Sequence, residues 1–101
     1  MKSASVSPPL VQMRALLVED NLMNAELART LLELAGHQVR VVTTGAAFRE
    51  AVAKGPPPDI VLMDILLPDA NGAALLAALR AAGQWAAVPV VALTAQALTG
   101  D

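Results

Sequence analysis

Residues 60–72 read IVLMDILLPDANG, and this stretch decides the fold. Four apolar residues, 60–63, stop abruptly at the carboxylate of Asp64, with prolines at 56–58 and at 68. A short apolar run between turn residues is typical of a strand buried on both faces of a sheet. Because open α/β sheets bind ligands at the carboxyl ends of their strands, Asp64 is the first candidate site residue. The plainer alternative is that Asp64 only ends a strand.

Three other runs of strand length flank this one, at 13–18, 38–42 and 89–93. Helical patterns separate the runs, with Asn21 or Asp20 and Thr44 as candidate caps and Gly36 and Gly83 as stops. The order β-α-β-α-β-α-β predicts a parallel sheet with helices on both faces, joined by right-handed crossovers. The spacing predicts inward side chains at Leu27, Leu31, Leu34, Phe48, Val52, Leu75, Leu76 and Leu79.

Composition narrows the class of protein. The 101 residues suit one small domain at 13–101 after a flexible leader at 1–12, and 55% of them are hydrophobic. No apolar run approaches the length of a membrane span, and no secretory signal is visible, so we expect no membrane partner. The absence of cysteine is compatible with a cytoplasmic protein. A net charge of −2 without a basic cluster argues against direct nucleic-acid binding.

Polar side chains follow three of the four predicted strands. Glu19 and Asp20 follow the first, Asp64 the third and Thr94 the fourth. If these strands are neighbours, the side chains meet at one edge of the sheet. Two carboxylates at about 4 Å repel by about 4 kcal/mol at an effective dielectric near 20, so such a cluster calls for a proton or a cation. Oxygen ligands alone favour Mg²⁺, and Thr94 with the small Ala95 adds donors for a phosphoryl group.

Two single residues have plainer explanations. His37 is the only histidine and follows the first helix, at the end of the sheet away from Asp64, so an exposed loop role is favoured over phosphorylation or metal binding. Trp85 is best explained as a partly buried packing residue.

The blocks VEDN at 18–21, MDILLP at 63–68 with Gly72, and PVVALTA at 89–95 resemble the receiver domain of two-component response regulators. The resemblance covers about residues 13–101, and the VEDN form is most similar to receivers of hybrid histidine kinases and single-domain regulators. It implies a flavodoxin-like (CheY-like) doubly wound fold with strand order 2-1-3-4-5.

The resemblance also implies roles for individual residues. Asp64 would accept a phosphoryl group from a phosphohistidine on a histidine kinase or a phosphotransfer protein. Asp20 would bind Mg²⁺ directly and Glu19 through water, and the Leu66 carbonyl would complete the protein ligands. Thr94 would be the switch hydroxyl, while Ala95 would donate its N–H. Such a domain assists its own phosphorylation and dephosphorylation and is not otherwise an enzyme.

One feature departs from the family pattern. Receivers carry a lysine after a fifth strand, whereas here the sequence stops at Asp101, and its two lysines, Lys2 and Lys54, are poorly placed to substitute. We therefore expect a sheet of order 2-1-3-4 without the fifth strand and last helix, and self-association through the strand at 89–93.

Other classes compete with this interpretation. A haloacid-dehalogenase-like phosphatase would need an acid where Leu66 stands, and a Rossmann dinucleotide binder would need glycines where residues 19–21 stand. A receiver-like module that binds partners without phosphorylation stays open, because the lysine is missing.

Overall fold

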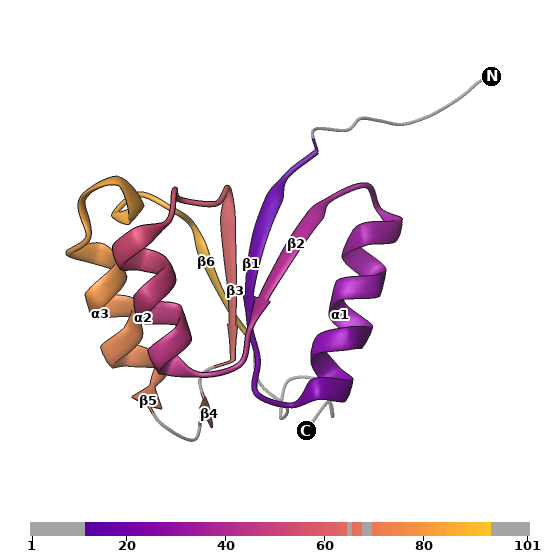
Figure 1. The fold of residues 1–101 in the computed structure, drawn as a ribbon, viewed down its shortest axis with the longest axis horizontal. Helices are drawn as coiled ribbons and strands as arrows, with labels where there is room; N and C mark the ends of the chain where they lie inside the picture. The colour runs from indigo at the N-terminus through magenta and orange to yellow at the C-terminus, as the bar shows by residue number, and fades with distance from the viewer. Residues whose placement is uncertain (1–11, 65, 68–69, 94–101) are drawn as a thin grey trace.

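The computed structural model describes residues 12–64, 66–67 and 70–93, and Figure 1 shows their arrangement. The elements, in chain order, are β1 (Arg14–Val18), α1 (Leu22–Leu34), β2 (Gln38–Val42), α2 (Gly45–Lys54), β3 (Ile60–Asp64), β4 (Leu66–Leu67), β5 (Ala70–Asn71), α3 (Gly72–Arg80), a 3₁₀ turn (Gly83–Trp85) and β6 (Val90–Leu93).

The main sheet is parallel and has the strand order β2-β1-β3-β6. Val18 lies opposite Val42 on one side and Met63 on the other, and Asp64 lies opposite Leu93. Since all four strands run the same way, their carboxyl ends share one edge, at the bottom of Figure 1, which we call the carboxyl edge. The opposite edge is the amino edge. The predicted order 2-1-3-4 is therefore confirmed, with β6 as its fourth strand.

Each of the three α-helices in the described residues begins at the carboxyl edge with a side-chain cap. The side-chain oxygens of Asn21, Thr44 and Asn71 accept hydrogen bonds from backbone N–H groups three residues later. Such bonds satisfy donors that an uncapped first turn would leave unpaired. Gly36 follows α1 with φ of 96°, a conformation that only glycine adopts without strain.

The hydrophobic core lies between the sheet and the α2–α3 layer, on the left in Figure 1. Phe48 and Trp85 meet edge to face there, with ring centroids 6.4 Å apart. The core is completed from the strands, the two helices and the connection before β6 by Leu16, Val18, Val42, Ala51, Val61, Met63, Leu67, Leu75, Leu79 and Val88.

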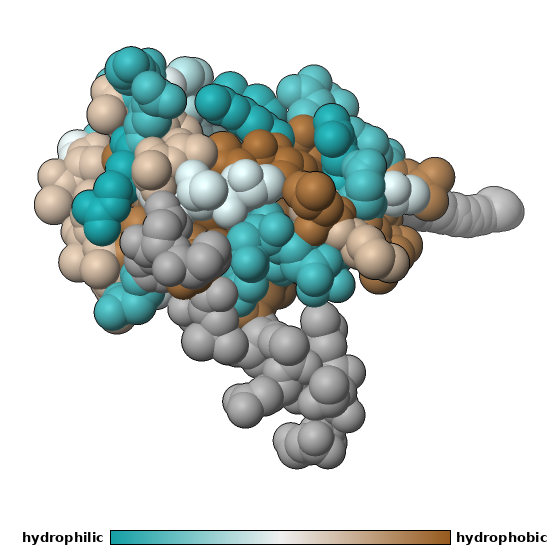
Figure 2. Space-filling view, turned by 60° about the horizontal axis from the view of Figure 1, so that its bottom comes forward, coloured by the Kyte–Doolittle hydropathy of each residue, from teal (hydrophilic) through white to brown (hydrophobic). Residues whose placement is uncertain are grey.

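The opposite face carries α1 alone among the described elements, packed on β2 and β1 (Figure 1). The predicted inward stripe on α1 is wrong, because Leu27, Leu31 and Leu34 are 62%, 59% and 79% exposed. Figure 2, with the carboxyl edge turned forward, shows hydrophobic surface on the side where α1 lies. Their spacing does place these leucines on one side of α1, but the described residues provide no layer that covers this side.

Two smaller expectations also need correction. β3 is buried on one face only, since Val61 and Met63 are buried whereas Leu62 is half-buried. Leu76 is 37% exposed rather than inward, because it lies on the outer side of α3. The described residues after Asp64 also contain the short antiparallel pair β4 and β5, which the sequence pattern does not predict.

No helix in the described ranges is both long enough and apolar enough to cross a membrane.

Candidate functional site

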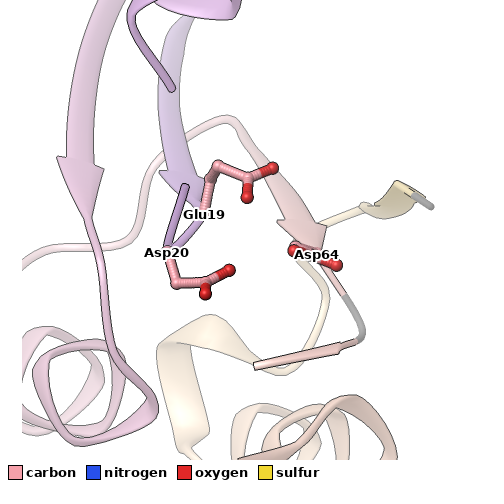
Figure 3. A group of neighbouring side chains, drawn as sticks. All are labelled: Glu19, Asp20 and Asp64. Atoms are coloured by element: carbon pink, nitrogen blue, oxygen red, sulfur yellow. The ribbon is translucent and has the colours of Figure 1, made fainter. Parts of the chain in front are cut away.

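Three acidic side chains meet at the carboxyl edge. Glu19 and Asp20 follow β1, and Asp64 ends β3. β1 and β3 are hydrogen-bonded neighbours, so the positions just beyond Val18 and Met63 lie side by side. One carboxylate oxygen from each acid falls within 4.8 Å of the others. Figure 3 shows the carboxylates of Glu19 and Asp20 pointing toward the end of β3, where Asp64 lies.

Glu19 is held in place by its own backbone and by the start of α1. Its N–H donates to the carbonyl of Val42 at 3.0 Å, which extends the β1–β2 ladder by one step. Its carboxylate accepts the N–H of Asn21 at 3.1 Å. Asn21 in turn caps α1, so the turn that carries Asp20 is fixed at both ends. Glu19 is 7% exposed, while Asp20 is exposed to solvent.

Burial raises the pKa of the Glu19 carboxyl above its usual value. The negative charges of Asp64 and Asp20 and a side-chain hydrogen bond with Asp64 raise this pKa further, while the hydrogen bond from Asn21 opposes them. The folded protein therefore disfavours a third negative charge at this edge. A bound cation would reverse that preference, because it favours the ionised carboxylates.

The donor set fits a hard divalent cation. All three side chains present oxygen, and each offers one ligand atom. Exposed Asp20 and half-buried Asp64 leave the cluster accessible from solvent, whereas Glu19 forms its inner wall. Mg²⁺ is commonly bound by a few carboxylates while water or phosphate oxygens fill its other positions. The fit rests on the ligands' chemistry and their separation.

The other residues that the sequence analysis weighed for this site divide into three groups. Thr94 and Ala95 lie outside the described residues. Leu66 begins β4, two positions after Asp64, and is paired with Asn71. Lys54 lies at the end of α2 and forms an ion pair with Glu50 at 3.1 Å, so it does not join the acid cluster.

His37 lies at the amino edge, next to the first residue of β2, as expected. Its Nδ1 accepts the backbone N–H of Met13 at 3.1 Å. His37 is half-buried rather than a plain exposed loop residue, because this hydrogen bond ties it to the chain entering β1. No sequence signal marked this contact, since it joins residues 24 positions apart.

A doubly wound α/β domain with acids at the ends of two central strands is the class that the fold and the site define. Residues 15–100 match the family model of the response regulator receiver domain, so the chain belongs to that family.

Among curated proteins, it is 37% identical over 86 residues to the transcriptional regulatory protein GltR of Pseudomonas aeruginosa, covering 85% of this chain and 35% of that protein. It is 35% identical over 86 residues to the polar-differentiation response regulator DivK of Brucella ovis, covering 85% of this chain and 69% of DivK. The chain thus spans about a third of GltR.

Among solved structures, it resembles the receiver domain of the sensor histidine kinase PA1611 of Pseudomonas aeruginosa, with a TM-score of 0.78 and 34% identity. That match covers 90% of this chain and 74% of the PA1611 receiver chain, whose structure has a magnesium ion coordinated in the active site cleft.

Proposed function

We propose that this receiver domain accepts a phosphoryl group on Asp64 from a phosphohistidine of a partner protein, in a Mg²⁺-dependent step of two-component signalling. The observation that carries the proposal is the convergence of Glu19, Asp20 and Asp64 within 4.8 Å at the carboxyl edge. The donor is a histidine kinase or a histidine phosphotransfer protein, as the family membership suggests.

In the proposed reaction, a carboxylate oxygen of Asp64 attacks the phosphorus atom of the donor. The P–O bond to Asp64 forms as the P–N bond to the donor imidazole breaks, and the imidazole nitrogen keeps the electron pair. The product is an acyl phosphate on Asp64 and a free histidine on the partner. Bound Mg²⁺ would offset negative charge on the phosphoryl oxygens.

The chain's own residues would have separate roles in binding the metal ion and the phosphoryl group. Asp20 would be a direct metal ligand, because its carboxylate is exposed to solvent and lies within the acid cluster. Glu19, which is buried beside Asp20, would contact the metal through water. We retain the Leu66 carbonyl as the third protein ligand and Thr94 with Ala95 as the switch and phosphate-binding residues, on the resemblance of their motifs.

An acyl phosphate of low mass, such as acetyl phosphate, tests the acceptor without the partner. With Mg²⁺ present, intact-mass analysis should find one added phosphoryl group that base removes. Asp64→Asn should abolish the addition. Asp59→Asn is the matched control, because Asp59 lies before β3 at the amino edge, and it should be labelled like the unchanged chain. Labelling that persists in Asp64→Asn would assign the acceptor elsewhere.

Metal binding is tested separately by thermal unfolding. Mg²⁺ should raise the melting temperature, because it binds the folded cluster and not the unfolded chain. Asp64→Asn should stabilise the metal-free protein by removing one repelling charge, and should reduce the gain from Mg²⁺. An unchanged melting temperature at millimolar Mg²⁺ would refute the metal site. Metal binding without labelling would favour the alternative function, a module that binds partners without phosphorylation.

A further inference from the structure

A second candidate site lies at the amino edge, at the opposite end of the strands from the acid cluster. A cavity of about 250 Å³ opens there between the first halves of β1 and β2 and the proline loop that follows α2. Its lining residues are Arg14, Ala15, Leu16, Gln38, Arg40 and Pro56–Pro58, with Val39 and Trp85. The proposed phosphoryl transfer uses none of them.

The strand side of this cavity is set by the parallel register. Arg14 lies opposite Gln38, and Leu16 lies opposite Arg40. Partners in a parallel pair point to the same face of the sheet, and Leu16 belongs to the core on the α2–α3 face. The side chains of both arginines therefore start from that face, beside the hydrophobic core.

The opposite wall of the cavity is stiff. Residues 56–58 are three consecutive prolines, whose rings fix the backbone angle φ. Behind them, the indole N–H of Trp85 donates to the carbonyl of Gly55 at 3.2 Å, and its ring packs against Phe48. A ligand would thus meet a preformed apolar surface, which lowers the entropic cost of binding.

The two arginines differ in their partners. Arg14 lies 4.0 Å from a carboxylate oxygen of Asp59 and donates to the carbonyl of Pro57 at 3.4 Å. The side chain of Arg40 makes no hydrogen bond or ion pair with any described residue, although its backbone is paired with β1. Its Nη1 lies 3.8 Å from the position that a Cβ atom on Gly55 would occupy. The guanidinium therefore extends along the cavity wall. Arg14 and Arg40 on the cavity wall, set against the single neighbouring carboxylate of Asp59, leave the cavity with one uncompensated positive charge.

We infer that this cavity binds a small carboxylic acid with a flat apolar body. The Arg40 guanidinium would donate two parallel hydrogen bonds to the carboxylate, the geometry in which arginine binds carboxylates best. The apolar body would lie against the prolines and Trp85. Pockets for drug-sized ligands have volumes of about 300–1,000 Å³, so a cavity slightly below that range suits an acid with a single ring.

The tryptophan provides a local probe, because Trp85 is the only tryptophan in the chain. Its single indole N–H resonance can be followed by ¹H–¹⁵N NMR while benzoate is added to the 101-residue chain. We expect a saturable shift of this resonance, together with the backbone resonances of Leu16 and Arg40. Benzyl alcohol, which lacks the carboxylate, and inorganic phosphate, which lacks the apolar body, should each bind at least about tenfold more weakly.

Matched variants test the role assigned to Arg40. Arg40→Gln should weaken benzoate binding by about tenfold, and Arg40→Lys should be intermediate, since it keeps the charge but not the planar fork. Arg49→Gln removes the same charge from the exposed side of α2, outside the cavity, and should leave the affinity unchanged. Arg40 is exposed, so all three variants should fold, and the unliganded spectra will verify this.

Three results would overturn the inference. The first is a benzoate shift that never saturates. The second is an Arg40→Gln affinity within about twofold of the unchanged chain, which would mean that Arg40 supplies no charge-assisted bond. The third is equal binding of benzyl alcohol or phosphate. Phosphorylation at Asp64 plays no part in the measurement, so either proposal can fail alone.

Discussion

Leucine side chains are buried on one face of the sheet and exposed to solvent on the other. Leu79 on α3 is fully buried, whereas Leu31 on α1 is 59% exposed. Both leucines belong to helices that connect two strands of the main sheet, α1 between β1 and β2 and α3 between β3 and β6. The difference lies in the second layer: α2, α3 and the Trp85 turn close over one face, while the described residues place only α1 over the other. Periodicity thus identifies a helix's apolar side, but burial needs a neighbour to supply the remaining contacts.

The largest expected difference between the two faces comes from replacing one leucine by alanine on each face. Leu79→Ala should lower the free energy of unfolding by about 2–5 kcal/mol, because it leaves a cavity in a closed core. Leu31→Ala should lower it by less than about 1 kcal/mol, because most of that side chain already meets water. Urea denaturation of the two variants measures the contrast. Equal losses would show that the α1 face is covered in solution.

The helix caps provide a second pair. Thr44→Ala should cost about 1 kcal/mol of global stability, because α2 carries Phe48 and Ala51 of the core and cannot fray without opening it. Asn21→Ala removes the equivalent hydrogen bond from α1. We expect faster amide hydrogen exchange in the first turn of α1 and a smaller global loss. A larger global loss for Asn21→Ala would contradict the view that α1 is the more weakly held helix.

The unpaired side of strand β6 also predicts self-association of the protein. β6 is an edge strand of the described sheet, and Val91 is exposed on it. Unpaired apolar edges tend to pair with another chain, so the 101-residue protein should sediment above its monomer mass at micromolar concentration. Val91→Lys should shift it toward monomer, and Ala77→Lys, on the exposed side of α3, should not. A monomeric unchanged chain would rule out this mode of pairing.

The smallest predicted effect concerns pH and the acid cluster. Because folding raises the pKa of Glu19 above its usual 4.5, the folded protein binds more protons than the unfolded chain just above that pH. Without metal, the contribution of Glu19 to stability should therefore decline as pH rises from about 4.5 toward neutrality. Glu19→Gln should flatten the dependence, whereas Glu26→Gln on exposed α1 should not. The test is to measure the melting temperatures of the unchanged chain and of both variants across this pH range in the presence of a chelator.

The apolar runs of the sequence predicted four parallel strands, and the resemblance to receiver domains supplied their order in the sheet. Apolar runs that alternate with helical patterns leave few topologies, and acids placed after the first and third runs had to meet once those strands were neighbours. The short β4–β5 pair escaped prediction because a two-residue strand has no periodicity. The burial of Glu19 also escaped it, since that depends on the turn at Asn21 and on the carbonyl of Val42, contacts that side-chain patterns do not encode.

The dipoles of the three capped helices affect the electrostatic potential at the carboxyl edge and at the amino edge. The dipole of each helix places about half a positive charge at its first turn and half a negative charge at its last. Parallel strands require all three helices to begin at the carboxyl edge, so three positive helix ends surround the edge that holds Glu19, Asp20 and Asp64 (Figure 1). The negative ends lie toward the amino edge, where Arg14 and Arg40 stand, and Lys54 and Arg80 occupy last turns. The side-chain charges thus oppose the field of the backbone at both edges. An anion bound beside the acids would meet a weaker repulsion than three carboxylates alone would produce.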